Sequence, residues 1–147
     1  MPTILLVATA MTGCTQKSPP LPDATTQPRT KLPDYPIKVF RGCNRPCGFN
    51  DELNIQSDGG VLVQVKGRML QCQLDRASFA TLNDAAVTIE PTDLPTRTAR
   101  DDELQVALVS GAGVVDINDE RIAKAKPVIE QLLDDVHAPA AQRKICT

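Results

Sequence analysis

The sequence predicts an α+β domain, in which an antiparallel sheet carries two helices packed on one face. Apolar and polar residues alternate along several short segments, which is the period of a half-buried β-strand. Two other segments carry apolar residues at the spacing of an α-helix. These elements follow one another in the order ββββαββα. Strands in a meander, followed by helices that cover them, are typical of this class.

Four strands are predicted before the first helix. The alternation predicts them over residues 37–40, 53–56, 61–65 and 69–73. Between the second and third strands, Asp58-Gly59-Gly60 has the composition of a tight turn. These strands are therefore expected to form a meander.

The first helix is predicted over residues 76–87. Asp75 precedes it and is placed to accept hydrogen bonds from free backbone N–H groups, as an N-cap does. Leu74 and Phe79 occupy the two positions of a hydrophobic staple. Because Phe79 and Leu82 share one face, we expect that face to be buried.

An irregular, proline-containing segment at residues 91–95 separates this helix from the rest of the domain. Strands are predicted over residues 104–108 and 114–117, with a turn at 111–113 between them. The second helix is predicted to begin at Pro127, because proline suits the first helical turn. Its apolar stripe contains Val128, Ile129, Leu132, Leu133 and Val136.

The composition predicts three regions along the chain. Residues 1–13 combine a short apolar run with small residues, as a signal peptide does. Residues 14–36 are rich in proline and poor in apolar side chains, which predicts a linker. Residues 37–147 are predicted to form the globular domain.

The stretch Met11-Thr12-Gly13-Cys14 resembles the lipobox of bacterial lipoproteins, whose cysteine is lipidated and becomes the first residue of the mature chain. The resemblance implies a lipid anchor on Cys14 and a periplasm-facing place in the bacterial cell envelope. Thr15 follows the cysteine, and similarity to enterobacterial sorting then implies the outer rather than the inner membrane. The apolar run is far below the ~20 residues of a transmembrane helix. Two alternatives are an ordinary signal peptide with an incidental cysteine and a partly buried N-terminal strand.

Charge and composition disfavour several function classes. Lys and Arg total 16 and Asp and Glu total 18, which gives a net charge of −2. No basic stripe is present, so no nucleic-acid partner is expected. With three Phe, one Tyr and no Trp, the chain is poor in the aromatic faces that stack on bases or sugars.

The cysteines favour disulfides over a metal site. Setting aside Cys14 leaves four of the five cysteines, an even number in a chain predicted to be exported. Cys43 and Cys47 flank a proline, and their spacing allows them to close a small loop. A redox pair would instead need C-x-x-C at a helix start. A zinc site would need further ligands, and the only histidine is His137.

A strand ending in Arg-x-Cys-x-x-x-Cys, followed by a strand, an Asp-Gly turn and a Val-rich strand, resembles an uncharacterised domain of bacterial lipoproteins and secreted proteins. Members of that family carry Cys-x-Gly-x-Cys-Pro-x-Tyr, whereas Gly-Phe-Asn stands at residues 48–50. The resemblance spans about residues 37–145 and implies no particular activity. It places a cysteine pair in the same loop, which implies that Cys43 bonds Cys47 and leaves Cys72 for Cys146. A fainter similarity of layout links the chain to emfourin-like protease inhibitors.

Sequence motifs of catalysis are missing. There is no G-x-S-x-G, H-E-x-x-H, P-loop or dinucleotide fingerprint, so neither an enzyme nor a cofactor is expected. The acidic groups 101–103, 119–120 and 134–135 lack the order of a calcium loop and are expected to be solvated. His137 is expected at the surface, near a helix end.

The function expected from these features is that of a non-enzymatic envelope lipoprotein, a binding or assembly module with an envelope protein as its partner. The alternative is a periplasmic protease inhibitor that presents the Cys43–Cys47 loop, because a braced loop lowers the ordering cost of binding.

Overall fold

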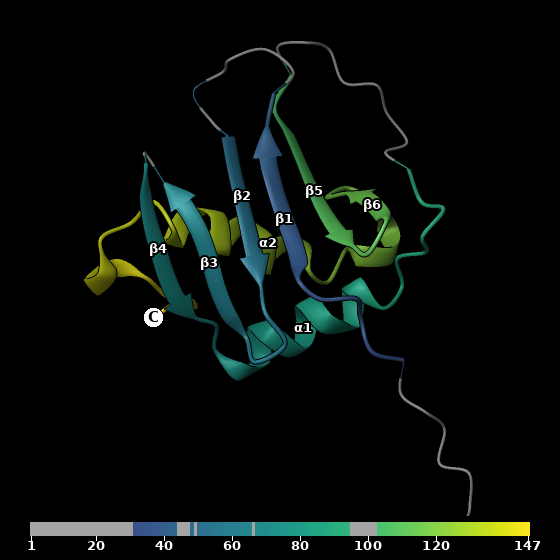
Figure 1. Ribbon diagram of the computed structural model, residues 1–147, viewed down its shortest axis with the longest axis horizontal. Helices are drawn as coiled ribbons and strands as arrows, with labels where there is room; N and C mark the ends of the chain where they lie inside the picture. The colour runs from purple at the N-terminus through teal and green to yellow at the C-terminus, as the bar shows by residue number, and fades with distance from the viewer. Residues whose placement is uncertain (1–30, 44–47, 49, 66, 95–102) are drawn as a thin grey trace, which may run out of the picture.

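Six strands form a single sheet in the computed structural model, which describes residues 31–43, 48, 50–65, 67–94 and 103–147 (Figure 1). The strands are β1 (Ile37–Gly42), β2 (Asn50–Ile55), β3 (Gly60–Val65), β4 (Arg68–Gln73), β5 (Gln105–Ser110) and β6 (Gly113–Asp116). Their order across the sheet is β4-β3-β2-β1-β5-β6, and all neighbours are antiparallel. The predicted antiparallel α+β fold is therefore confirmed.

Two α-helices complete the domain. They are α1 (Arg76–Ala86) and α2 (Lys126–Asp135), and two short 3-10 turns that were not predicted are η1 (Glu120–Ile122) and η2 (Ala140–Gln142). The helices contact each other, and both lie behind the sheet in Figure 1. The order ββββαββα and the placement of both helices on one face agree with the prediction.

The core lies between the sheet and the helices. Alternate residues of the strands point into it, as the pairing of Val39 with Leu53 on one side and Leu108 on the other illustrates. The apolar stripe of α2 faces these residues through Ile129 and Leu132, both fully buried. Burial of this shared apolar surface is the main stabilising contribution.

The start of α1 is as predicted. The Asp75 carboxylate accepts hydrogen bonds from the backbone N–H groups of Ala77 and Ser78, each at 3.0 Å. The Ser78 hydroxyl also donates to this carboxylate at 2.6 Å. The hydroxyl and N–H of Ser78 hold the pKa of Asp75 below its ordinary value. Leu74 is buried and Phe79 packs on the core, as expected for a staple.

Gly59 and Gly113 are positions where the structure requires glycine. Gly59, in the predicted turn between β2 and β3, has φ of +83°, a left-handed conformation that glycine adopts without strain. At the start of β6, a Cβ on Gly113 would collide with the carbonyl oxygen of Glu90. This close approach packs the β5–β6 turn against the segment that follows α1.

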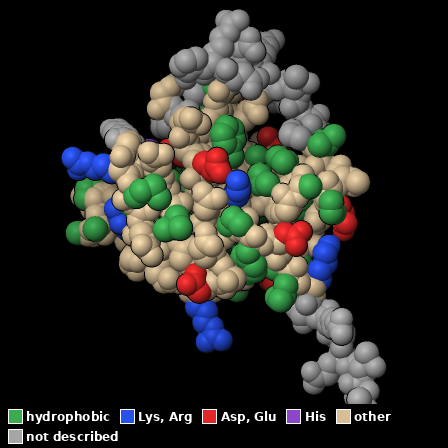
Figure 2. All heavy atoms as spheres, in the orientation of Figure 1, with side chains coloured by type: hydrophobic (Ala, Val, Ile, Leu, Met, Phe, Trp, Pro, Cys, Tyr) green, Lys and Arg blue, Asp and Glu red, His purple; other side chains and the backbone are tan. Residues whose placement is uncertain are grey.

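The other face of the sheet carries no helix among the described residues. Figure 2 views this face and shows scattered hydrophobic side chains around charged ones. An ion pair between Lys38 and Glu52, with an Nζ–Oε1 distance of 2.9 Å, lies across β1 and β2. Met69 of β4 is 69% exposed, so the apolar content of this face is partly solvated.

The last residues of the predicted linker contact the domain. Pro33 is buried, and the hydroxyl of Tyr35 donates to Oδ1 of Asn83 at 2.8 Å. The N–H of Asp34 donates to the hydroxyl of Ser110 at 3.3 Å. The packed structure thus includes residues that precede β1. In the described part of the chain, no helix has the length and apolar character needed to cross a membrane.

Candidate functional site

The C-terminal tail is attached to the edge strand β4. Cys146 forms a disulfide with Cys72, across a sequence separation of 74 and a Cα–Cα distance of 5.3 Å. Beside it, the backbone N–H of Gln73 donates to the carbonyl of Thr147 at 2.8 Å, and the N–H of Thr147 donates back at 3.1 Å. The predicted Cys72–Cys146 bond is therefore confirmed, and it holds the tail as a short extension of the sheet.

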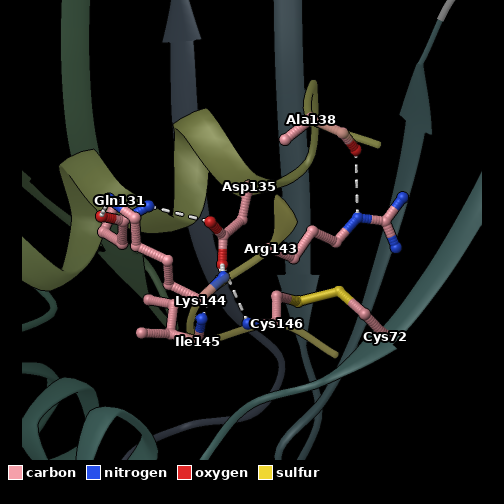
Figure 3. Close-up of a disulfide and its surroundings, with 8 residues drawn as sticks. All are labelled: Cys72, Gln131, Asp135, Ala138, Arg143, Lys144, Ile145 and Cys146. Atoms are coloured by element: carbon pink, nitrogen blue, oxygen red, sulfur yellow. Dashed lines mark hydrogen bonds between the residues drawn. A yellow bond between two sulfur atoms is a disulfide. The ribbon is translucent and has the colours of Figure 1, made fainter. Parts of the chain in front are cut away.

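A buried carboxylate supports this attachment from the other side (Figure 3). Asp135, 1% exposed at the end of α2, accepts through Oδ2 from the N–H groups of Lys144, Ile145 and Cys146 at 2.9, 2.7 and 3.0 Å. Its Oδ1 accepts from the side-chain amide of Gln131 at 2.8 Å. Burial alone would raise the pKa of Asp135, but these four hydrogen bonds lower it below its ordinary value.

A second buried acid joins the sheet to the end of α2. Arg41 and Asp51 lie directly opposite each other on β1 and β2, with side chains on the helix-facing side. Nε and Nη2 of Arg41 donate to Oδ2 of Asp51 at 2.8 and 2.6 Å. Nε2 of His137 lies 3.0 Å from each oxygen of the same carboxylate. The three residues form a cluster that connects His137, just after α2, to β1 and β2.

His137 also lines two hollows in the surface. The larger is a groove of about 760 Å³ between β4 and the chain that follows α2. It is lined by Val65, Arg68, Met69, Leu70, Gln71, Val136, His137, Ala138, Pro139 and Arg143. We call it the β4 groove. A smaller hollow of about 460 Å³ is lined by His137 together with Arg41 and Leu133.

The β4 groove is lined by apolar side chains, by polar ones and by two arginines. No Asp or Glu lines it. Arg68 has no ion pair or side-chain hydrogen bond with any described residue, and Arg143 uses its Nε to donate to the carbonyl of Ala138 at 3.2 Å. Such a site suits an elongated ligand with apolar groups and negative charge.

The remaining predicted site residues are described only in part. Cys43 directly follows β1, is half-buried and takes part in a disulfide. Its predicted partner Cys47 and the predicted lipidation site Cys14 lie outside the described residues. The Cys43–Cys47 pairing and the anchor therefore stay predictions.

The expectation of solvated acidic groups is wrong for Asp135, which is buried and hydrogen-bonded to the tail. It is right for the neighbouring Asp134, which is exposed. Asp119 caps η1 and forms an ion pair with Arg121 at 2.9 Å. Asp101 and Asp102 lie outside the described residues. Among the described side chains, no group of three or more His, Cys, Asp or Glu is arranged to hold a metal ion.

His137 lies just past α2, near the helix end as predicted, but its pairing with Asp51 was not foreseen. The two residues are 86 positions apart in the sequence, and no local motif connects them. One signal could have found it: extending the alternation of Leu53 and Ile55 back by two residues places Asp51 on the inward-facing side of the strand, where an acid requires a partner.

Comparison with known proteins identifies no relative: no family model, no curated protein and no solved structure matches the chain.

Proposed function

We propose that this chain is an exported, lipid-anchored binding or assembly module of the bacterial cell envelope. The observation that carries the proposal is the Cys72–Cys146 disulfide, because structural disulfides form and persist in oxidising compartments such as the periplasm. Export is also supported by the small-residue stretch that ends at Cys14 and by the proline-rich segment that follows it. The segment would hold the domain away from the membrane surface.

A binding role is supported by the β4 groove. Its two arginines, Arg68 and Arg143, have no acidic partner among the described residues, and most of its other lining residues are apolar. A preformed groove with few charged groups is typical of a recognition surface. An envelope protein is the partner that this location makes available.

Replacing Cys14 with Ser tests the anchor. In an enterobacterial host, the wild type should incorporate labelled palmitate and sediment with membranes, because acyl chains contribute about 0.8 kcal/mol for each buried methylene. The Cys14→Ser protein should lose the label and become soluble in the periplasm, whereas Thr15→Ser, a control at the next position, should behave as wild type. If Cys14→Ser still sediments with membranes as the wild type does, there is no lipid anchor at this cysteine.

The same host tests the choice of membrane. Density-gradient separation should place the wild type with the outer membrane, and Thr15→Asp should shift it to the inner membrane. A wild-type protein found in the inner membrane would contradict the proposed location.

The soluble Cys14→Ser protein then serves as bait for envelope extracts. Recovery of a structural envelope protein supports the assembly role. Recovery of a protease in a one-to-one complex would instead favour the alternative, an inhibitor that presents the Cys43–Cys47 loop.

A further inference from the structure

β4 lies at one edge of the sheet, and among the described residues the tail pairs with only one end of it. Gln73 exchanges two backbone hydrogen bonds with Thr147, while the N–H of Leu74 points the other way and donates to Gly59 at 3.0 Å. In an antiparallel strand the direction of the N–H and C=O groups alternates from residue to residue. The backbone groups of Gln71 and Met69 therefore point away from β3, like those of Gln73.

These backbone groups form an open edge. Among the described residues, neither Met69 nor Gln71 has a backbone partner on this side. Proteins usually protect a free edge with proline, a bulge or an inward charge. The register between β3 and β4 is continuous from Gly60–Gln73 to Val65–Arg68, and β4 contains no proline. Its only charged side chain is that of Arg68, at the first position of the strand, so none of these features lies between Met69 and Gln71. The edge is thus ready to pair with another strand.

The β4 groove runs beside this edge. Val65, Leu70 and Val136 supply apolar surface, while Arg68 and Arg143 supply positive charge. An extended peptide placed on the edge would direct alternate side chains into the groove. Those side chains would meet apolar walls and cations, and no acidic residue of the groove would repel a carboxylate.

We propose that the edge of β4 binds an extended acidic peptide segment of a partner protein, which adds a strand to the sheet in line with the C-terminal tail. Backbone hydrogen bonds to Met69 and Gln71 would hold the segment, and Arg68 and Arg143 would select its acidic side chains. The proposal names the kind of partner for the binding role above. It does not depend on the lipid anchor, so the two can fail separately.

The test uses the full chain with Cys14→Ser and a fluorescein-labelled probe, the heptapeptide Glu-Val-Glu-Val-Glu-Val-Gly. Fluorescence anisotropy at low salt should show saturable binding. The matched peptide with Lys in place of each Glu should bind about tenfold more weakly or worse, because it places like charges beside the two arginines.

Two substitutions at one position isolate the backbone contribution. Gln71→Pro removes the N–H that points to the free edge but no bond to β3, and edge strands accept proline in this setting. The Gln71→Pro substitution should weaken binding of the acidic probe by about tenfold or more. Gln71→Ala removes the same side chain but keeps the N–H, so Gln71→Pro should weaken binding about tenfold more than Gln71→Ala does. Arg68→Glu should abolish binding of the acidic probe.

Amide hydrogen exchange is measured by NMR on the protein without a substitution in β4. It tests whether the peptide pairs with the β4 edge even if Gln71→Pro unfolds. The amides of Met69 and Gln71 should exchange rapidly in the free protein and become about tenfold or more protected when the probe is added. If their exchange does not change at saturating peptide, or if no binding is seen, the proposal is overturned. It is also overturned if these amides are protected without peptide and sedimentation shows a dimer, because a second copy would then occupy the edge.

Discussion

At the scale of single residues, Asp135 connects α2 to the C-terminal tail. One oxygen accepts three backbone N–H groups and the other accepts a side-chain amide. Hydrogen bonds to a charged acceptor contribute about 1.5–3 kcal/mol each, more than neutral ones. Stability should therefore depend on the ionisation of this carboxyl.

Asp135→Asn should lower the free energy of unfolding at pH 7 by about 2 kcal/mol. The pKa of Asp135 is lower in the folded protein than its ordinary value, so the carboxylate stabilises the fold above the unfolded pKa of about 3.9. This contribution is lost as the pH falls through the folded pKa, so the difference between wild type and variant should shrink in acid. Urea denaturation at pH 7 and in the acid range measures it.

Asp134→Asn is the matched control, because this neighbouring acid is exposed. Its effect should stay within about 0.5 kcal/mol at both pH values. A loss for Asp135→Asn that does not diminish in acid would show that the ionised form is not what stabilises the tail.

Residue-scale features of the site were the hardest to foresee. Asp134 and Asp135 look alike in the sequence, and only their positions around α2 make one solvated and the other buried. The Asp51–His137 contact depends on the packing of α2 against the ends of β1 and β2. Local patterns contain no information about such long-range geometry.

At the scale of elements, the sequence patterns were more informative. The capped α1 was predicted to within a residue of its observed end, because a cap, a staple and a periodic face all agreed. The strands were predicted from alternation, although several begin or end a few residues away from the predicted bounds. The order of strands was not predicted: β5 pairs with β1, which lies more than 60 residues earlier, and alternation specifies a buried face but not a partner.

The N-cap of α1 offers a test at this scale. Asp75→Ala removes the acceptor for the N–H groups of Ala77 and Ser78 and should cost about 1 kcal/mol in unfolding free energy. Asp75→Asn keeps a side-chain oxygen at the same place and should cost much less. Equal losses for the two variants, in parallel urea titrations, would mean that the cap is not the stabilising feature.

At the scale of the whole molecule, the tail and disulfide link the last residues to the sheet edge. This arrangement combines three features on one side of the domain: the end of α2, the β4 groove and the open part of the β4 edge. A tail that frayed would expose the edge from Gln73 onward. The disulfide thus both stabilises the fold and limits how much of the edge is open to a partner.

Removing the Cys72–Cys146 bond should destabilise the domain substantially. Cross-linking residues separated by 74 positions restricts the unfolded chain, and the loop-entropy relation gives a stabilisation of about 4 kcal/mol. The double variant Cys72→Ser/Cys146→Ser should therefore lose about that amount of unfolding free energy in urea titrations. The variant Cys43→Ser/Cys47→Ser opens a much shorter predicted loop and should lose far less. Dithiothreitol should destabilise the wild type while leaving the Cys72→Ser/Cys146→Ser protein almost unchanged.

Peptide mapping of the unreduced, exported protein supplies the control for connectivity. It should recover one fragment that joins Cys72 to Cys146, in agreement with the structure. A fragment joining Cys72 to Cys43 or Cys47 would contradict the pairing. If Cys72→Ser/Cys146→Ser instead lost no more stability than Cys43→Ser/Cys47→Ser, the tail would be held mainly by the Asp135 hydrogen bonds. Releasing the tail would then require removal of both the disulfide and that carboxyl.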